Sequence, residues 1–152
     1  MKKKIALLLA VMCLLSALCG CGGSKKDLEP AAFVQEMLGA NFTDSLNKLD
    51  DAVVPILYNV NEADYSSAIV YCGTAATAEE IAVFTAVDEA AAGRILSAAE
   101  ARVASQIESY KNYGPASAMM LENAIVKKTG NTVVVVVCAD ADSAAKIADK
   151  YL

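Results

Sequence analysis

The sequence predicts an α+β fold: one four-stranded, mostly antiparallel sheet made from two strand-strand-helix units, with an N-terminal helical segment packed on it. Two observations carry this prediction. Each half of the chain contains two short apolar runs followed by an aspartate and a helical pattern. The aspartate and the helix residues that follow it match between the two halves at a constant offset of 52 positions, as from Asp88 to Asp140. The matching residues are few and alanine-rich, so the order of the elements supports the repeat more than the identities do.

The first residues have the layout of an export signal. Lysines at positions 2–4 precede an uncharged apolar run over residues 5–18. This run is shorter than the roughly 18–20 apolar residues that span a bilayer as a helix. A secretory signal peptide over residues 1–20 is therefore favoured over a permanent transmembrane helix.

The end of the apolar run predicts a lipid anchor. Leu18-Cys19-Gly20-Cys21 resembles a bacterial lipobox, with an aliphatic residue three positions before Cys21 and a small residue directly before it. Cys21 is thus the expected lipidation site and new N-terminus; an ordinary cleaved signal with an incidental cysteine is the weaker alternative. Residues 21–29 are expected to form a flexible tether. The diacylglyceryl group on a lipobox cysteine carries two acyl chains, which hold a protein stably at a membrane. Because the signal peptide exports the chain, we expect the protein on the extracytoplasmic face of the cell membrane.

Residues 30–152 are expected to form a single α+β domain that begins with a helical segment over residues 30–60. Pro30 suits a first helical position, and Gly39 suits a helix stop. Apolar residues continue at helical spacing after Gly39, but Pro55 predicts a break in that stretch.

The first strand-strand-helix unit is predicted over residues 66–114. Its strands lie around residues 68–70 and 81–84. Asp88 is placed where an N-cap acceptor belongs, before a long helix with one apolar stripe. Gly114-Pro115 ends this helix, because proline cannot continue it.

The second unit is predicted over residues 122–152. Its strands lie around residues 124–126 and 133–137, with Gly130-Asn131 at a tight hairpin turn. Asp140 is the expected N-cap of the last helix.

The repeat also predicts how the strands are ordered. If the two halves pair through their second strands, the order is first, second, fourth, third. Cys72 and Cys138 then lie at the same end of the sheet, two strand spacings or ~9–10 Å apart. A disulfide needs Cα atoms within about 7 Å, so we predict two reduced, packed thiols.

Both faces of this sheet are predicted to be covered. In the second and fourth strands, the residues that point to either face of the sheet are apolar, which is typical of a sheet buried on two sides. The two repeat helices are expected to cover one face, and the segment 30–60 the other. The competing interpretations are that this segment is a mobile flap, or that the face is a dimer or partner interface.

Composition excludes several classes of function. Removing residues 1–20 removes three of the 13 basic residues and none of the 18 acidic ones, so the formal charge becomes 10 − 18 = −8. An acidic domain argues against nucleic acid as a partner. The chain has no histidine, which removes Ser-His-Asp and Cys-His catalysis and histidine-containing zinc sites. The two cysteines left beside Cys21 are no disulfide framework.

Several short motifs together resemble a known family. They are Leu57-Tyr58, Tyr71-Cys72-Gly73, Ala78-Glu79-Glu80-Ile81-Ala82-Val83-Phe84, Arg102, Gln106, Tyr110, Tyr113-Gly114-Pro115, Leu121-Glu122-Asn123-Ala124 and Gly130-Asn131. The chain resembles, over roughly residues 33–150, a clostridial-type (Firmicutes) lipoprotein family classed as a domain of unknown function. The resemblance implies attachment to a Gram-positive cell surface. It implies no established activity, so it brings no catalytic residue.

Three polar motifs could carry chemistry, and each has a simpler interpretation. Glu79-Glu80 could be an acid pair, but neighbours in a strand point to opposite faces, so solvated charges at the strand entry are favoured. Asp140-Ala141-Asp142 could bind calcium, but that ion prefers six to eight oxygen ligands, and helix capping explains the motif better. Ser143 and Lys146 could mimic a Ser-Lys dyad, although a plain helix surface is favoured.

The remaining candidate is a group of ring-bearing residues at the end of the long helix. Tyr110, Tyr113 and Pro115 could form a partner-recognition patch. Anchoring the helix end to the sheet is the slightly favoured alternative.

The expected function is that of a membrane-anchored cell-envelope lipoprotein, a noncatalytic interaction or ligand-binding module without metal or cofactor. Its expected partners are the membrane, through the lipid on Cys21, and an envelope protein or small ligand. The alternative is a small envelope enzyme that uses carboxylates and tyrosines.

Overall fold

The computed structural model describes residues 28–40, 44–74 and 76–152. The predicted signal peptide over residues 1–20, the lipidation site Cys21 and most of the tether 21–29 lie outside these ranges. In the described part of the chain, no helix is long and apolar enough to cross a membrane.

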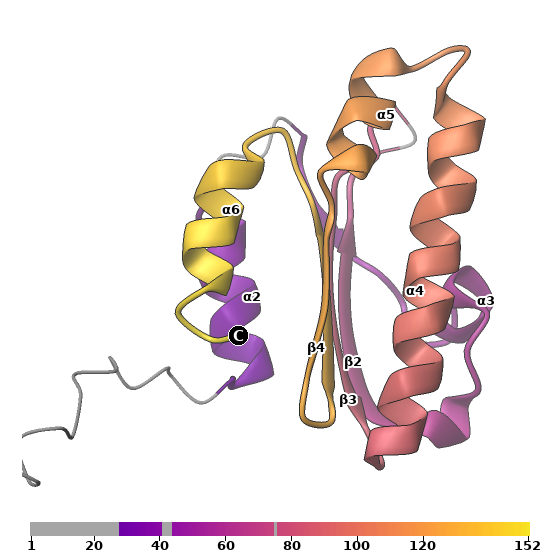
Figure 1. Cartoon of the computed structure of the whole chain (residues 1–152), viewed down its shortest axis with the longest axis vertical. Helices are drawn as coiled ribbons and strands as arrows, with labels where there is room; N and C mark the ends of the chain where they lie inside the picture. The colour runs from indigo at the N-terminus through magenta and orange to yellow at the C-terminus, as the bar shows by residue number, and fades with distance from the viewer. Residues whose placement is uncertain (1–27, 41–43, 75) are drawn as a thin grey trace, which may run out of the picture.

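A single antiparallel sheet forms the centre of the molecule (Figure 1). Its strands are β1 (Asn47–Lys48), β2 (Tyr65–Cys72), β3 (Glu80–Ala86), β4 (Ile125–Thr129) and β5 (Thr132–Val137). They lie in the order β1-β2-β3-β5-β4, and every neighbouring pair is antiparallel. The prediction of four strands is therefore wrong, because the segment 30–60 adds the short edge strand β1. The other four strands follow the predicted order.

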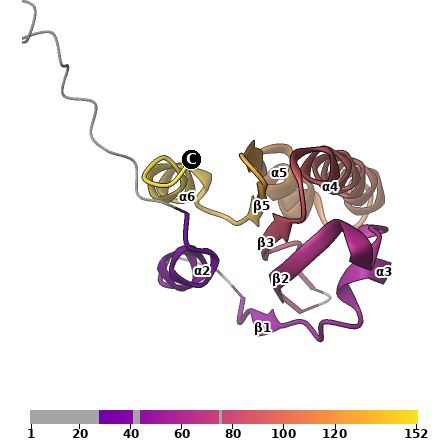
Figure 2. The ribbon, with the colours of Figure 1, turned by 90° about the horizontal axis from the view of Figure 1, so that it is seen from below.

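Helices cover both faces of the sheet. They are α2 (Pro30–Leu38), α3 (Val54–Tyr58), the short 3-10 helix η2 (Glu62–Asp64), α4 (Glu89–Tyr110), α5 (Pro115–Glu122) and α6 (Ala141–Ala148). Figures 1 and 2 show α3, α4 and α5 on one side of the sheet and α2 and α6 on the other. The expectation that α4 and α6 share a face is thus wrong, and the two predicted units are not equivalent in space.

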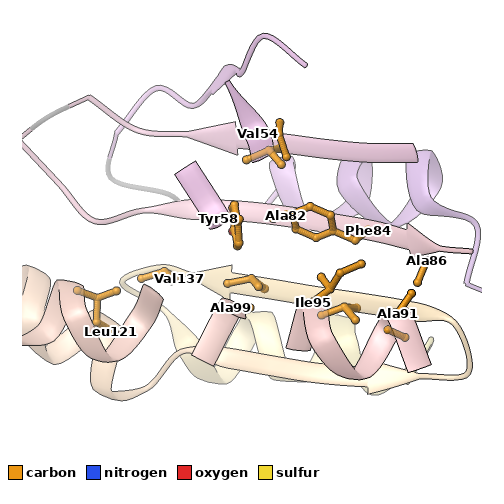
Figure 3. Packing of buried hydrophobic residues seen from close by; sticks show 14 of the residues in the cluster. Val54, Tyr58, Ala82, Phe84, Ala86, Ala91, Ile95, Ala99, Leu121 and Val137 are labelled. Atoms are coloured by element: carbon orange, nitrogen blue, oxygen red, sulfur yellow. The ribbon is translucent and has the colours of Figure 1, made fainter. Parts of the chain in front are cut away.

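Each face of the sheet has its own hydrophobic core. The first core cluster joins Ala82 and Phe84 of β3 to Ile95 of α4 and Tyr58 of α3 (Figure 3). The second core cluster joins Ile81 and Val83 of β3 to residues of α2 and α6. Alternate residues of β3 therefore point into different cores, as the period of a strand requires.

Local signals place the helix starts and the tight hairpin where the sequence predicts them. The Asp88 carboxylate accepts a hydrogen bond from the Ala91 N–H at 2.7 Å and caps α4. The Asp140 carboxylate accepts one from the Ser143 N–H at 3.0 Å and caps α6. The turn between β4 and β5 contains Gly130 at φ 53°, a conformation that favours glycine.

The segment 30–60 divides between the two cores. From α2, Phe33, Val34 and Met37 are buried in the second core cluster. From α3, which begins at Val54 directly before Pro55, Val54 and Tyr58 are buried in the first. The segment is therefore core, and it covers part of both faces rather than only the second.

Cys72 and Cys138 are both free. They lie near the same end of the sheet, since Cys72 pairs with Glu80 and Glu80 pairs with Val137. Cys72 packs against the first core cluster, whereas Cys138 belongs to the second. The strand β3 and the plane of the sheet thus separate the two thiols.

Candidate functional site

Two hollows lie side by side along α4. The first, of about 360 Å³, lies between the end of α3 and α4. The second, of about 200 Å³, lies between α4 and the loop that joins β2 to β3. Both are lined by Leu57, Arg102 and Gln106. We call the two hollows together the α4 groove.

Small side chains on α4 leave room for the first hollow. Ala98, Ala101 and Ser105 line it and follow one another at helical spacing, so they lie on one face of the helix. Opposite them, α3 ends at Tyr58, and its C-cap Asn59 adopts the left-handed conformation with φ 51°. Asparagine tolerates this conformation better than most residues, and it ends α3 at the edge of the first hollow.

A buried ion pair forms the floor of the groove. Arg102 Nη2 lies 2.7 Å from Glu80 Oε2, and its Nε lies 3.4 Å from Glu80 Oε1. The Glu80 side chain is 4% exposed and that of Arg102 is 16% exposed. Arg102 Nη1 also donates to the Leu57 carbonyl at 3.5 Å, which ties α4 to α3.

Tyr58 completes this buried cluster. Its hydroxyl donates to Glu80 Oε1. The Arg102 guanidinium carbon lies 5.1 Å from the centroid of the Tyr58 ring, a cation–π distance. Phe84 packs edge-on against the same ring, with 4.9 Å between the centroids. We call Tyr58, Glu80 and Arg102 the floor cluster.

Burial keeps the Tyr58 hydroxyl and the Cys72 thiol protonated. Desolvation, reinforced by the nearby Glu80, raises the pKa of Tyr58 well above its usual value. The same two causes raise the pKa of the Cys72 thiol, which lines the second hollow, to about 12. Neither a phenolate nor a thiolate is therefore available at this site near neutral pH.

The sequence suggested that Glu79 and Glu80 are solvated. In the structure both are buried. Glu79 is 1% exposed, and it accepts a hydrogen bond from the Asp44 N–H at 2.7 Å. Glu80 belongs to the floor cluster, held by α3 and α4. The chain after α2 and the long helix cover this end of β3, which strand alternation alone does not show.

A second polar cluster shapes the rim of the second hollow. The Asp44 carboxylate accepts hydrogen bonds from the Thr74 N–H and hydroxyl, both at 2.7 Å, and from the Thr77 hydroxyl at 3.0 Å. The Thr74 hydrogen bonds lower the pKa of Asp44 to about 2. A Cβ at Gly73 would lie 2.7 Å from Thr77 Oγ1, so this close approach requires glycine.

The predicted recognition residues are separated by their exposure. The Tyr110 hydroxyl donates to the Thr77 carbonyl at 3.2 Å, which anchors the end of α4 to the β2–β3 loop. Tyr113 lies against Tyr110 with 5.1 Å between ring centroids, yet it is 70% exposed. Pro115 begins α5. None of the three lines the α4 groove.

The other polar motifs contribute no site in the structure. Asp140 caps α6, which is the capping role favoured from the sequence. Ser143 and Lys146 lie on α6, across the sheet from the groove. Within the described residues, no group of three or more Cys, Asp or Glu side chains could hold a metal ion.

Sequence reasoning missed Tyr58 and Arg102 as site residues. Arg102 follows the buried Ile95 by seven positions, two helical turns, and so shares the buried face of the long helix. Glu80 likewise shares a strand face with Ala82 and Phe84. Opposite charges on two apolar faces were the available signal for a buried pair.

Comparison with known proteins identifies a family. No curated protein and no solved structure matches the chain. Residues 40–138 match a family described as a domain of unknown function, DUF4358. This range contains the sheet, the floor cluster and both hollows of the groove, whereas α2 and α6 lie outside it. The match covers well over half of the 152 residues, and the chain therefore belongs to the DUF4358 family.

Proposed function

We propose that the protein is a membrane-anchored cell-envelope lipoprotein that acts as a noncatalytic binding module, with the α4 groove as its binding site. The observation that carries this proposal is the buried ion pair beneath an open groove. Apolar residues of similar volume usually stabilise a core as well as a buried ion pair does. Stability alone thus gives little reason for Arg102 and Glu80 at this place, whereas recognition of a polar ligand does.

The chemistry of the floor favours binding over the alternative of an enzyme that uses carboxylates and tyrosines. Both oxygens of Glu80 accept hydrogen bonds from Arg102 or Tyr58. The Glu80 side chain is only 4% exposed, whereas a general base must come within hydrogen-bond reach of a substrate proton. The raised pKa values of Tyr58 and Cys72 oppose a nucleophilic role.

A matched pair of variants tests the binding site. Ala101→Trp fills the first hollow, whereas Ala104→Trp places the same side chain on an exposed position of α4. Wild type and both variants are purified from detergent-solubilised native envelopes, and co-purifying molecules are identified by mass spectrometry. We expect a ligand or partner with wild type and Ala104→Trp that is lost with Ala101→Trp. The same set on all three proteins would contradict the groove as the site.

The membrane anchor rests on the lipobox and has its own test. Cys21→Ala should release the protein from membranes and abolish labelling with a fatty-acid probe, because the thiol is the acyl acceptor. Cys19→Ala is the control and should change neither. The reverse pattern would show that the lipidation site is assigned to the wrong cysteine.

A further inference from the structure

We infer that the α4 groove selects a neutral ligand that carries an amide group, and that it discriminates against carboxylates and other anions. This inference rests on the proposed binding function and names the ligand chemistry of that site. The donors, acceptors and charges at the floor of the groove lead to it.

Arg102 has donors to spare. A guanidinium carries five N–H donors. Three of them are used inside the protein: Nε and one N–H of Nη2 bind Glu80, and one N–H of Nη1 binds the Leu57 carbonyl. One N–H therefore remains on each Nη atom. Because Arg102 lines both hollows, these two donors are placed to bind an acceptor oxygen in the groove.

The charge of Arg102 is already cancelled. Its bidentate partner Glu80 neutralises it within the buried cluster. Among the described residues, no other cationic side chain lines either hollow, and the Asp44 carboxylate binds Thr74 and Thr77 on the rim. An anion would therefore meet donors without net positive charge, and it would lose its hydration on entry. A neutral carbonyl oxygen can use the same donors at a much smaller desolvation cost.

Gln106 supplies the complementary half of an amide site. It lies one helical turn after Arg102, is half-buried and lines both hollows. Among the described residues its side-chain amide has no hydrogen-bond partner, so both its oxygen and its NH₂ group are available. A ligand amide whose oxygen binds Arg102 can donate its N–H to the Gln106 oxygen. Leu57, Ala98 and Ala101 offer apolar surface beside these groups for the aliphatic part of a ligand.

Acetamide and acetate form the matched test, because they share a shape and differ in charge. Each is titrated into the isotope-labelled full chain in detergent micelles, and NMR follows the Arg102 Nε–H and the Gln106 side-chain amide. We expect acetamide to shift both signals with an apparent Kd at least about tenfold lower than that of acetate. N-acetylalanine methylamide and N-acetylglucosamine are then compared, to distinguish a peptide amide from a sugar amide as the source.

Two variants separate the site from its surroundings. Gln106→Leu should lose most of the acetamide response while the fold is kept. Glu100→Gln changes an exposed residue outside the groove and should leave the response unchanged. Acetate binding as tightly as acetamide would overturn the ligand class and leave the groove as a binding site. If no probe shifted the groove signals, both the inference and the groove as a small-ligand site would be overturned.

Discussion

Arg102→Met tests how much stability the protein loses when the buried Glu80 carboxylate has no cationic partner. Methionine fills much the same volume but removes the guanidinium, so both Arg102–Glu80 hydrogen bonds and the cation–π contact with Tyr58 are lost. Glu80, whose side chain is 4% exposed, then keeps the Tyr58 hydroxyl but has lost its cationic partner. Breaking a buried pair in this way typically destabilises a protein by ~3–5 kcal/mol. Because the groove admits water beside this position, we expect about 3 kcal/mol, the lower end of that range.

The double variant Arg102→Met/Glu80→Gln is the matched control. A neutral amide at position 80 can still accept the Tyr58 hydroxyl, while the uncompensated charge is gone. We expect the double variant to be more stable than Arg102→Met by at least about 1.5 kcal/mol. Most of the stability lost in the single variant comes from the buried carboxylate that has no cationic partner. Urea unfolding of the chain from Gly22 onward, followed by circular dichroism, measures both. A single variant that loses less than about 1 kcal/mol, or a double variant no better than the single one, would refute this reasoning.

Three further predictions follow from other parts of the molecule. Burial raises the pKa of Cys72 to about 12 and that of Cys138 to about 11, so both should react with iodoacetamide at least about tenfold more slowly in the native than in the urea-unfolded protein at about pH 8; a native Cys72–Cys138 bridge in mass spectrometry would contradict the fold. Phe33→Ala, in the second core cluster, should destabilise the protein by ~3–5 kcal/mol, whereas Ile56→Ala, at a position 79% exposed, should change stability by less than about 0.5 kcal/mol; similar effects of the two would show that α2 is not core. The Thr74 hydrogen bonds depress the pKa of Asp44 to about 2. The ionised carboxylate therefore stabilises the β2–β3 loop fully at pH values above the usual carboxyl pKa, and this stabilisation is lost as the pH falls through about 2. Hydrogen exchange of the Thr74 N–H should therefore report protection that persists to about pH 3, and Asp44→Asn should weaken it at every higher pH.

The local chemistry of the chain determines where its elements begin and end. Asp88 and Asp140 cap helices because a short carboxylate can accept the unpaired N–H groups of a first turn, whatever the helix packs against. Gly130-Asn131 forms the tight turn because glycine reaches positive φ without strain. These preferences act over a few residues, so they can be read without knowing the fold. Apolar residues that point to both faces of β3 and β5 also predict a sheet that is covered on both sides.

The face that each helix covers depends on strand register, which the repeat does not contain. The offset of 52 equates Val83 with Val135, but Val83 pairs with Val134 in the sheet. Because directly paired residues share a face, equivalent positions of the two halves point to opposite sides. The last buried residue of β3, Ala86, therefore faces the first core cluster, while its counterpart Cys138 faces the second. The chain leaves each strand on that side, and so α4 and α6 lie on opposite faces.

The floor cluster is likewise a product of tertiary structure. The sequence by itself determined the helix caps, the tight turn and the apolar pattern, and it predicted the order of β2 to β5 on the condition that the two halves pair through their second strands. It placed Tyr58, Glu80 and Arg102 on three different elements, 22 positions apart at each step, and left their common position open. Only the packing of α3 and α4 on β3 brings the three together. Burying a carboxylate costs several kcal/mol unless a partner arrives from elsewhere in the chain, and that partner is set by the whole fold rather than by any local pattern.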